Sequence, residues 1–151
     1  MYSKDDIKTL NSEKYVIENQ KIFFGSRGAN PESICSGIVE GALILGCINT
    51  NIVRIGSWWI ISSSDDWLSA PNILNIDYNN VFKALNAFPE AGQNSHRNEF
   101  LAFVFSSALV TSDEKETIQL KGNKDDFVAF KNAIREYEKS KRILGFRFFK
   151  I

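Results

Sequence analysis

Apolar residues repeat at helical spacing in two segments of the chain. Between residues 95 and 110 they cover most of a helical circumference, as at Phe100 and Phe103. This pattern predicts a central, Phe-rich and nearly buried helix over residues 95–110. C-terminal to Asn123, which can cap a helix, apolar residues again recur at helical spacing as far as Tyr137 and predict a second helix.

Helix-start signals place two further helices and a short N-terminal one. Asn30 followed by a proline is typical of a capped first turn, and this helix is expected to end at about Glu40. Asp77 is expected to cap a helix that Pro89 stops. Residues 3–11 carry carboxylates near their start and predict a short helix or an ordered arm.

Segments rich in β-branched and aromatic residues predict the strands. The segment 52–61 holds two of the three tryptophans and is expected to be a central strand, which the polar run from Ser62 to Asp66 ends. Further strands are predicted over residues 13–24, 117–121 and 142–150. The apolar run 42–48 fits either a helix or a strand, and a strand is favoured, with residues 49–51 as a hairpin turn. The chain is therefore expected to form one α+β (mixed α/β) domain over residues 1–151, with a single layer of mostly antiparallel strands packed against about four helices.

Composition narrows the classes of function. The apolar fraction of 44% and the charged fraction of 24% are ordinary for a globular protein, and twelve Phe against one Met predict a core of large rings. Lys plus Arg equals Asp plus Glu, with 18 of each. A neutral chain has no net field that attracts nucleic acid, and the aromatic residues do not form the signature of an RNA-binding sheet, so no direct nucleic acid contact is expected.

The same features predict a cellular compartment. The N-terminal residues are charged and lack the apolar segment of a signal peptide, and the longest apolar run, 42–48, is too short to span a bilayer. Cys35 and Cys47 lie in apolar surroundings without CxxC spacing and are expected to be reduced, buried thiols. We therefore expect a cytoplasmic protein without a membrane segment.

Residue types that carry catalysis or bind metals are few. The chain has one histidine, His96, and both cysteines are expected to be buried, so neither a zinc site nor an activated thiol is predicted. No GxSxG motif is present, and the GSRG segment lacks the spacing and the lysine of a phosphate-binding loop. We expect no catalytic residue, metal or cofactor. A hydrolase or transferase that uses His96 with an Asp or Ser stays open as the alternative.

Two polar segments are candidates for recognition. Asp65 and Asp66 are consecutive, so their side chains are expected to point apart. One interpretation is that they end a strand or cap a turn before a packed Trp67. The other is that they form half of a carboxylate pair. The segment from Phe88 to Glu99 concentrates donors and acceptors ahead of the Phe-rich helix. A capped helix start explains this composition, and so does a recognition surface on a rigid scaffold.

The chain has a Trp-rich predicted strand that ends in SDDWL, followed by an FPE-G-NS-R-E loop that opens a Phe-rich predicted helix. In these motifs it resembles small immunity proteins of bacterial polymorphic toxins, including those of contact-dependent growth inhibition systems. The resemblance spans residues 56–110 and transfers no individual residues, because these families share no catalytic set. It implies a cytoplasmic protein that binds a cognate toxin domain, often a nuclease, and blocks its active site. Inhibitors of basic nucleases are commonly acidic, whereas this chain is neutral, which shifts the expected contact to a local patch of carboxylates, namely Asp65, Asp66, Asp77, Glu90 and Glu99.

The leading hypothesis is therefore a non-enzymatic immunity protein whose partner is a toxin domain. Its predicted partner-binding residues are Asp65, Asp66, Trp67, Asp77, Glu90, Gln93, Asn94, His96, Arg97 and Glu99. The alternatives are the enzyme that uses His96 and a structural subunit that self-associates through exposed Phe or Trp.

Overall fold

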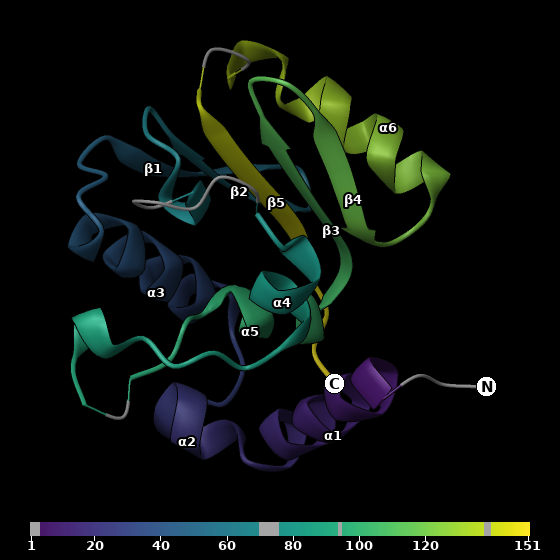
Figure 1. Cartoon of the computed structure of the whole chain (residues 1–151). Coiled ribbons are helices and arrows are strands. Elements are labelled where there is room, and N and C mark those ends of the chain that lie inside the picture. The colour runs from purple at the N-terminus through teal and green to yellow at the C-terminus, as the bar shows by residue number, and fades with distance from the viewer. Residues whose placement is uncertain (1–3, 70–75, 94, 138–139) are drawn as a thin grey trace.

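The computed structural model describes residues 4–69, 76–93, 95–137 and 140–151 and shows an antiparallel sheet with helices on both faces (Figure 1). The strands are β1 (Thr50–Ile55), β2 (Trp58–Ser63), β3 (Ser106–Asp113), β4 (Thr117–Lys121) and β5 (Arg142–Phe148), in the order β1-β2-β5-β3-β4. The helices are α1 (Lys4–Glu18), α2 (Gln20–Phe24), α3 (Pro31–Ile44), α4 (Tyr78–Lys83), α5 (Glu99–Val104) and α6 (Lys124–Ala133). The predicted α+β class is confirmed.

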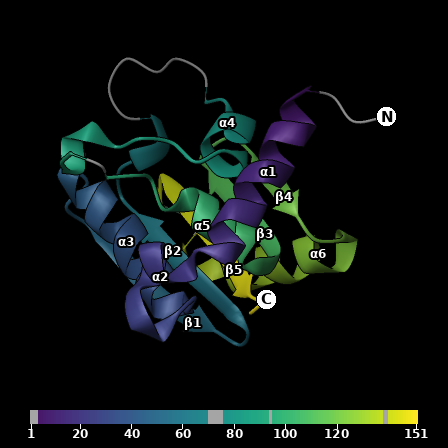
Figure 2. The same cartoon turned by 90° about the horizontal axis from the view of Figure 1, so that it is seen from below.

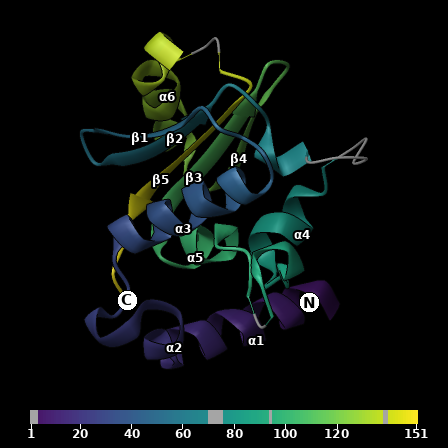
Figure 3. The ribbon, with the colours of Figure 1, turned by 90° about the vertical axis from the view of Figure 1, so that its left-hand side faces the viewer.

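The helices form layers around the sheet. Helix α6 covers one face, whereas α3 and α5 lie on the other (Figure 3). Helices α1 and α2 form an outer layer beyond α5. This outer layer is nearest to the viewer when the molecule is seen from below (Figure 2).

The sheet separates two apolar cores. Along the central strand β5, Leu144 and Phe146 face the larger core under α3 and α5, while Ile143 faces the smaller core under α6. Gly145 leaves room for α6, because a Cβ at this position would lie 2.5 Å from Cε1 of Phe130. The predicted last strand is thus confirmed, and it is the centre of the sheet.

The predicted strand 52–61 is wrong in its extent. The segment is a hairpin in which β1 and β2 pair from Thr50 with Ser63 to Ile55 with Trp58. The turn falls at residues 56–57, where Gly56 has φ 60°, a value that glycine adopts without strain. Strand-forming residues on both sides of Gly56 and Ser57 led to one predicted strand, and β1 is an edge strand rather than a central one.

The predicted strand 42–48 and the turn 49–51 are also wrong. Helix α3 continues to Ile44, beyond the expected end at Glu40. It is closed by Gly46, with φ 95°, whose N–H donates to Leu43 O, while the N–H of Cys47 donates to Ala42 O. This is the Schellman arrangement, in which glycine ends a helix.

The predicted central helix 95–110 is wrong, because only α5 is helical in this region. Lys121 Nζ donates to the carbonyl oxygen of Phe103 at 2.7 Å and meets one of the carbonyls that a helix end leaves free. The chain then enters β3, where Ala108 faces α6 and Leu109 faces the opposite core. A strand buried on both faces is apolar at nearly every position, so its spacing resembles that of a buried helix.

The predicted strand 13–24 is helical instead. Helix α1 extends from Lys4 to Glu18, well past the expected end at residue 11, and α2 follows directly. Val16 is buried, while its neighbour Tyr15 is exposed. The short apolar run from Tyr15 to Ile17 has no clear alternation, and a helix with a narrow buried stripe also produces such a run.

Three helix caps were predicted correctly. The side chains of Asn30, Asp77 and Asn123 accept hydrogen bonds from backbone N–H groups at the starts of α3, α4 and α6. Helix α4 ends at Lys83, before the expected stop at Pro89. The strand 117–121 is confirmed as the edge strand β4.

Candidate functional site

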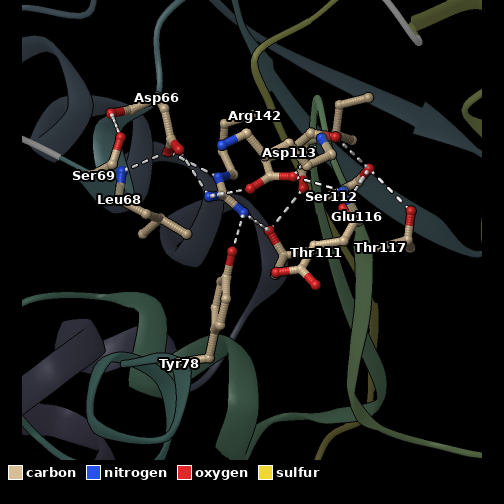
Figure 4. Close-up of polar contacts among 12 residues, drawn as sticks. Asp66, Leu68, Ser69, Tyr78, Thr111, Ser112, Asp113, Glu116, Thr117 and Arg142 are labelled. Carbon is tan, nitrogen blue, oxygen red and sulfur yellow. Dashed lines mark hydrogen bonds and ion pairs between the residues drawn. The ribbon is translucent and has the colours of Figure 1, made fainter. Parts of the chain in front are cut away.

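A buried arginine on β5 binds Asp66, whose side chain is largely covered (Figure 4). Arg142 is 0% exposed. Its Nε and Nη2 donate to Oδ1 and Oδ2 of Asp66, both at 2.8 Å, while Nη1 donates to the hydroxyls of Tyr78 at 3.2 Å and Thr111 at 3.1 Å. A planar guanidinium paired with a carboxylate at two points is among the strongest polar contacts in proteins.

This network links the segment after β2 to the centre of the sheet. Burial raises the pKa of the Asp66 carboxyl, but the hydrogen bonds and charge of Arg142 outweigh burial and hold the pKa below its ordinary value of 3.8. Asp66 also accepts from the N–H of Leu68 at 3.0 Å, which fixes the turn that buries Trp67. Asp66 and Trp67 are therefore committed to internal contacts, and we leave them out of the proposed binding surface.

The segment between α4 and α5 forms a small hairpin. The N–H of Phe88 donates to Ser95 O at 2.8 Å, and the N–H of Arg97 donates to Asn86 O at 2.9 Å. A β-bridge between Ala87 and His96 lies between these bonds. We call residues 86–98 the recognition hairpin; Glu90 and Gln93 are exposed at its tip, and Asn94 lies outside the described residues.

Two glycines on α3 let the recognition hairpin approach the helix closely. A Cβ at Gly37 would lie 2.6 Å from Cγ of Asn98, and a Cβ at Gly41 would lie 3.0 Å from Cε2 of Phe88. These glycines are four residues apart and so lie on one face of the helix. Their spacing was the signal in the sequence that marked this contact.

Gly37→Ala is expected to lower the free energy of unfolding by about 1 kcal/mol, because the clash with Asn98 exceeds the gain in helix propensity. Urea denaturation measures the change. Exposed Ser36→Ala, the neighbouring control, gains helix propensity without a clash and is expected to be neutral or slightly stabilising. Equal stability of the two variants would show that the hairpin does not depend on the close approach.

A cleft of about 320 Å³ opens between α2, α3 and the recognition hairpin. Its size is within the range of small ligand sites. It is lined by Phe23, Gly37, Glu40, Gly41, Ile44, Phe88, Ala91, Ser95, His96 and Asn98. Of the ten predicted binding residues, His96 lines this cleft, whereas the α2 and α3 wall has no predicted residue.

The imidazole of His96 forms part of the cleft wall. Its ring packs edge-on against Phe23, with centroids 4.9 Å apart, and its Nδ1 lies 3.1 Å from the carbonyl oxygen of Arg97. Ser95 and Glu40 line the same cleft. Within the described ranges, no hydrogen bond joins His96 to the Ser95 hydroxyl or the Glu40 carboxylate, so they do not form an assembled catalytic triad.

Arg97 and Glu99 form an internal pair at the base of the recognition hairpin. Arg97 Nη2 donates to Glu99 Oε1 at 2.6 Å, and the guanidinium lies 5.0 Å from the centre of the Phe88 ring. Glu99 is only 2% exposed. This carboxylate is buried, so it is also left out of the binding surface.

The predicted carboxylate patch is divided by these contacts. Asp65 is exposed after β2, and Asp77 caps α4, while Asp66 and Glu99 are each paired with an arginine. Glu90 stays available at the hairpin tip. The predicted binding residues therefore lie in separate parts of the structure. Those in the recognition hairpin lie beside the cleft.

The thiols are buried, as predicted. Burial, together with the nearby Glu32 charge, raises the pKa of Cys35 to about 12, and burial also raises the pKa of Cys47. Cys35 therefore stays protonated at neutral pH and is not an activated nucleophile.

Among the residues that the structure describes, no cluster of three or more His, Cys, Asp or Glu side chains is arranged to hold a metal. None of the helices in these same ranges is long and apolar enough to span a bilayer.

Comparison with known proteins adds no assignment. No family model matches the sequence, and neither the curated proteins nor the solved structures yield a significant match.

Proposed function

We propose that this chain is a non-enzymatic immunity protein that binds a cognate bacterial toxin domain, for example a nuclease, and blocks its active site. The observation that carries the proposal is an exposed apolar surface beside the cleft. Tyr15, Phe23 and His96 form an aromatic row in which the Tyr15 and Phe23 rings lie 6.0 Å apart, edge to face. Tyr15 is 49% exposed. Exposed tyrosine that is packed on one side is typical of protein interfaces.

Ile44 lines the cleft and is an exposed aliphatic residue, and further aliphatic residues are exposed on the two helices that line the cleft. Ile22 on α2 and Leu43 and Ile44 on α3 are all exposed. Exposed apolar residues gathered in one place and bordered by polar groups mark protein-binding sites. We define the cleft face as the lining of the cleft together with Tyr15, Ile22, Leu43 and Glu90.

The cleft face also has the charge that a basic toxin domain would meet. Glu40 and Glu90 are exposed on α3 and at the tip of the recognition hairpin. The neighbouring Arg97 is already paired with Glu99 and so does not neutralise them. Acidic groups around an apolar centre favour a partner that presents Lys or Arg, such as the phosphate-binding surface of a nuclease.

Co-expression tests this proposal directly. The protein encoded immediately upstream of this gene is expected to be toxic when produced alone, cells that also produce this chain are expected to survive, and the two proteins are expected to co-purify. Variants with Tyr15→Ala should protect less, because large interface aromatics often dominate binding. Failure of the wild-type protein both to bind and to protect would contradict the proposal.

An enzyme that uses His96 is the second candidate, because the cleft places Ser95 and Glu40 beside the imidazole. It makes a separable prediction. His96→Ala would abolish a catalytic activity while leaving the fold intact, whereas an immunity protein with this substitution would still protect cells, with at most a weakened interface.

A further inference from the structure

The cleft has features that select a cation. Glu40 is exposed on its wall, near the C-terminal end of α3. This end carries a partial negative charge, which disfavours a carboxylate and favours a positive group. The last turn of α3 contains no basic residue.

Within the described chain, Glu40 has no ion-pair partner. Its carboxylate therefore adds negative charge where the helix offers no compensation. An exposed carboxylate without an ion-pair partner in the described residues is available to a cationic ligand.

The other walls of the cleft suit the same ligand. Phe23 and Phe88 contribute aromatic rings, and Ser95 and Asn98 contribute groups that can accept hydrogen bonds. The Phe88 ring is 3% exposed and is already covered by the guanidinium of Arg97 at 5.0 Å, so the half-buried Phe23 is the more accessible of the two rings. Cations are attracted to ring faces, and arginine is the residue most often found there.

We propose that the cleft receives a single arginine side chain of the toxin domain, with the guanidinium paired to Glu40. This inference rests on the proposed function and specifies its central contact. An arginine that a nuclease uses to hold phosphate would then be occupied by the carboxylate of Glu40, in the paired geometry that these two groups favour. The aliphatic part of the side chain would lie against Ile44 and Phe23.

The test uses the full chain and a small probe, N-acetyl-arginine methylamide, followed by amide shifts in a ¹⁵N correlation spectrum. The probe is expected to bind weakly and to shift the amides of Gly41, Ser95 and His96. The neutral isostere N-acetyl-citrulline methylamide is the ligand control and should produce no such shifts. Equal affinity for the two probes would overturn the assignment, because the cleft would then not distinguish the charged guanidinium from its neutral isostere.

Glu40→Gln is expected to weaken binding of the arginine probe about tenfold, the size of one charge-assisted hydrogen bond. The control is Glu32→Gln, which removes an exposed carboxylate from the first turn of the same helix and should leave the affinity within about twofold. An unchanged affinity in Glu40→Gln, or shifts confined to other parts of the chain, would overturn the inference.

The same variants separate this inference from the proposed function. If the toxin domain binds the wild type and Glu40→Gln equally well, the immunity function stands and the arginine contact is wrong. If the arginine probe binds as expected but the toxin domain does not bind at all, the cleft is a guanidinium site and the proposed function fails.

Discussion

Asp66→Asn is expected to lower the free energy of unfolding by about 3 kcal/mol. The substitution keeps the shape of the side chain but removes the charge that compensates Arg142, which is fully buried. An uncompensated charge in the interior is strongly destabilising. Asp113 does not replace the lost partner, since its carboxylate lies 3.9 Å from Arg142 Nη2 and keeps more contact with solvent. Urea denaturation monitored by tryptophan fluorescence measures the loss.

Asp65→Asn is the matched control for this experiment. Asp65 is the adjacent carboxylate but is exposed, so its substitution is expected to change stability by no more than about 0.5 kcal/mol. A similar small effect in Asp66→Asn would mean that the ion pair adds nothing to the fold.

The contribution of Asp66 should also depend on pH. Its pKa is lowered in the folded state, so the folded protein holds the carboxylate more strongly in its charged form than the unfolded chain does. This stabilisation is complete above the unfolded pKa, near 3.8, and is lost as the pH falls through the lower, folded pKa. The difference in stability between wild type and Asp66→Asn should therefore be constant near neutral pH and shrink in acid.

Arg97→Met is expected to lower the free energy of unfolding by about 2 kcal/mol. It leaves the Glu99 carboxylate buried without its partner and removes the cation that covers the Phe88 ring. The start of α5 offsets part of the cost, because a carboxylate is favoured in the first turn of a helix. The recognition hairpin should loosen with this loss, which amide exchange at Phe88 reports.

A second substitution distinguishes a charge effect from lost packing. Adding Glu99→Gln to Arg97→Met should restore more than half of the lost stability, because no buried charge is then left without a partner. If the double variant is less stable than Arg97→Met alone, the cost does not come from the orphaned carboxylate.

The sequence predicted local chemistry better than distant contacts. Asn30, Asp77 and Asn123 cap helices through bonds to residues three positions away, so their neighbours suffice to identify them. The ends of helices and strands were harder to predict from the sequence. Gly46 closes α3 where an apolar run suggested a strand, and β3 is buried on both faces and so lacked the alternation of a strand.

In the candidate site, too, local sequence features were easier to predict than contacts between distant residues. The polar composition of the segment before Glu99 marked it as a candidate for recognition, but the predicted helix from residue 95 is wrong there, because residues 95–97 belong to a hairpin. The opposite wall was missed because Glu40 and Phe23 join the cleft only through packing of α2 and α3. Asp66 likewise gave no hint of its partner, since Arg142 lies 76 positions away. The helical spacing of Gly37 and Gly41 was the available signal for a close packing contact.

The central claim is that the cleft face binds the toxin domain, and one calorimetric comparison tests it. Ile44→Lys and Val128→Lys introduce the same charge at exposed aliphatic positions, 41% and 51% exposed, on helices that cover opposite faces of the sheet. Ile44 lines the cleft, whereas Val128 lies on α6. We predict that Ile44→Lys weakens binding of the toxin domain by about thirtyfold, as expected for an interface hot spot, and that Val128→Lys leaves it within about twofold. Equal affinities for the two variants, or a larger loss in Val128→Lys, would contradict the account.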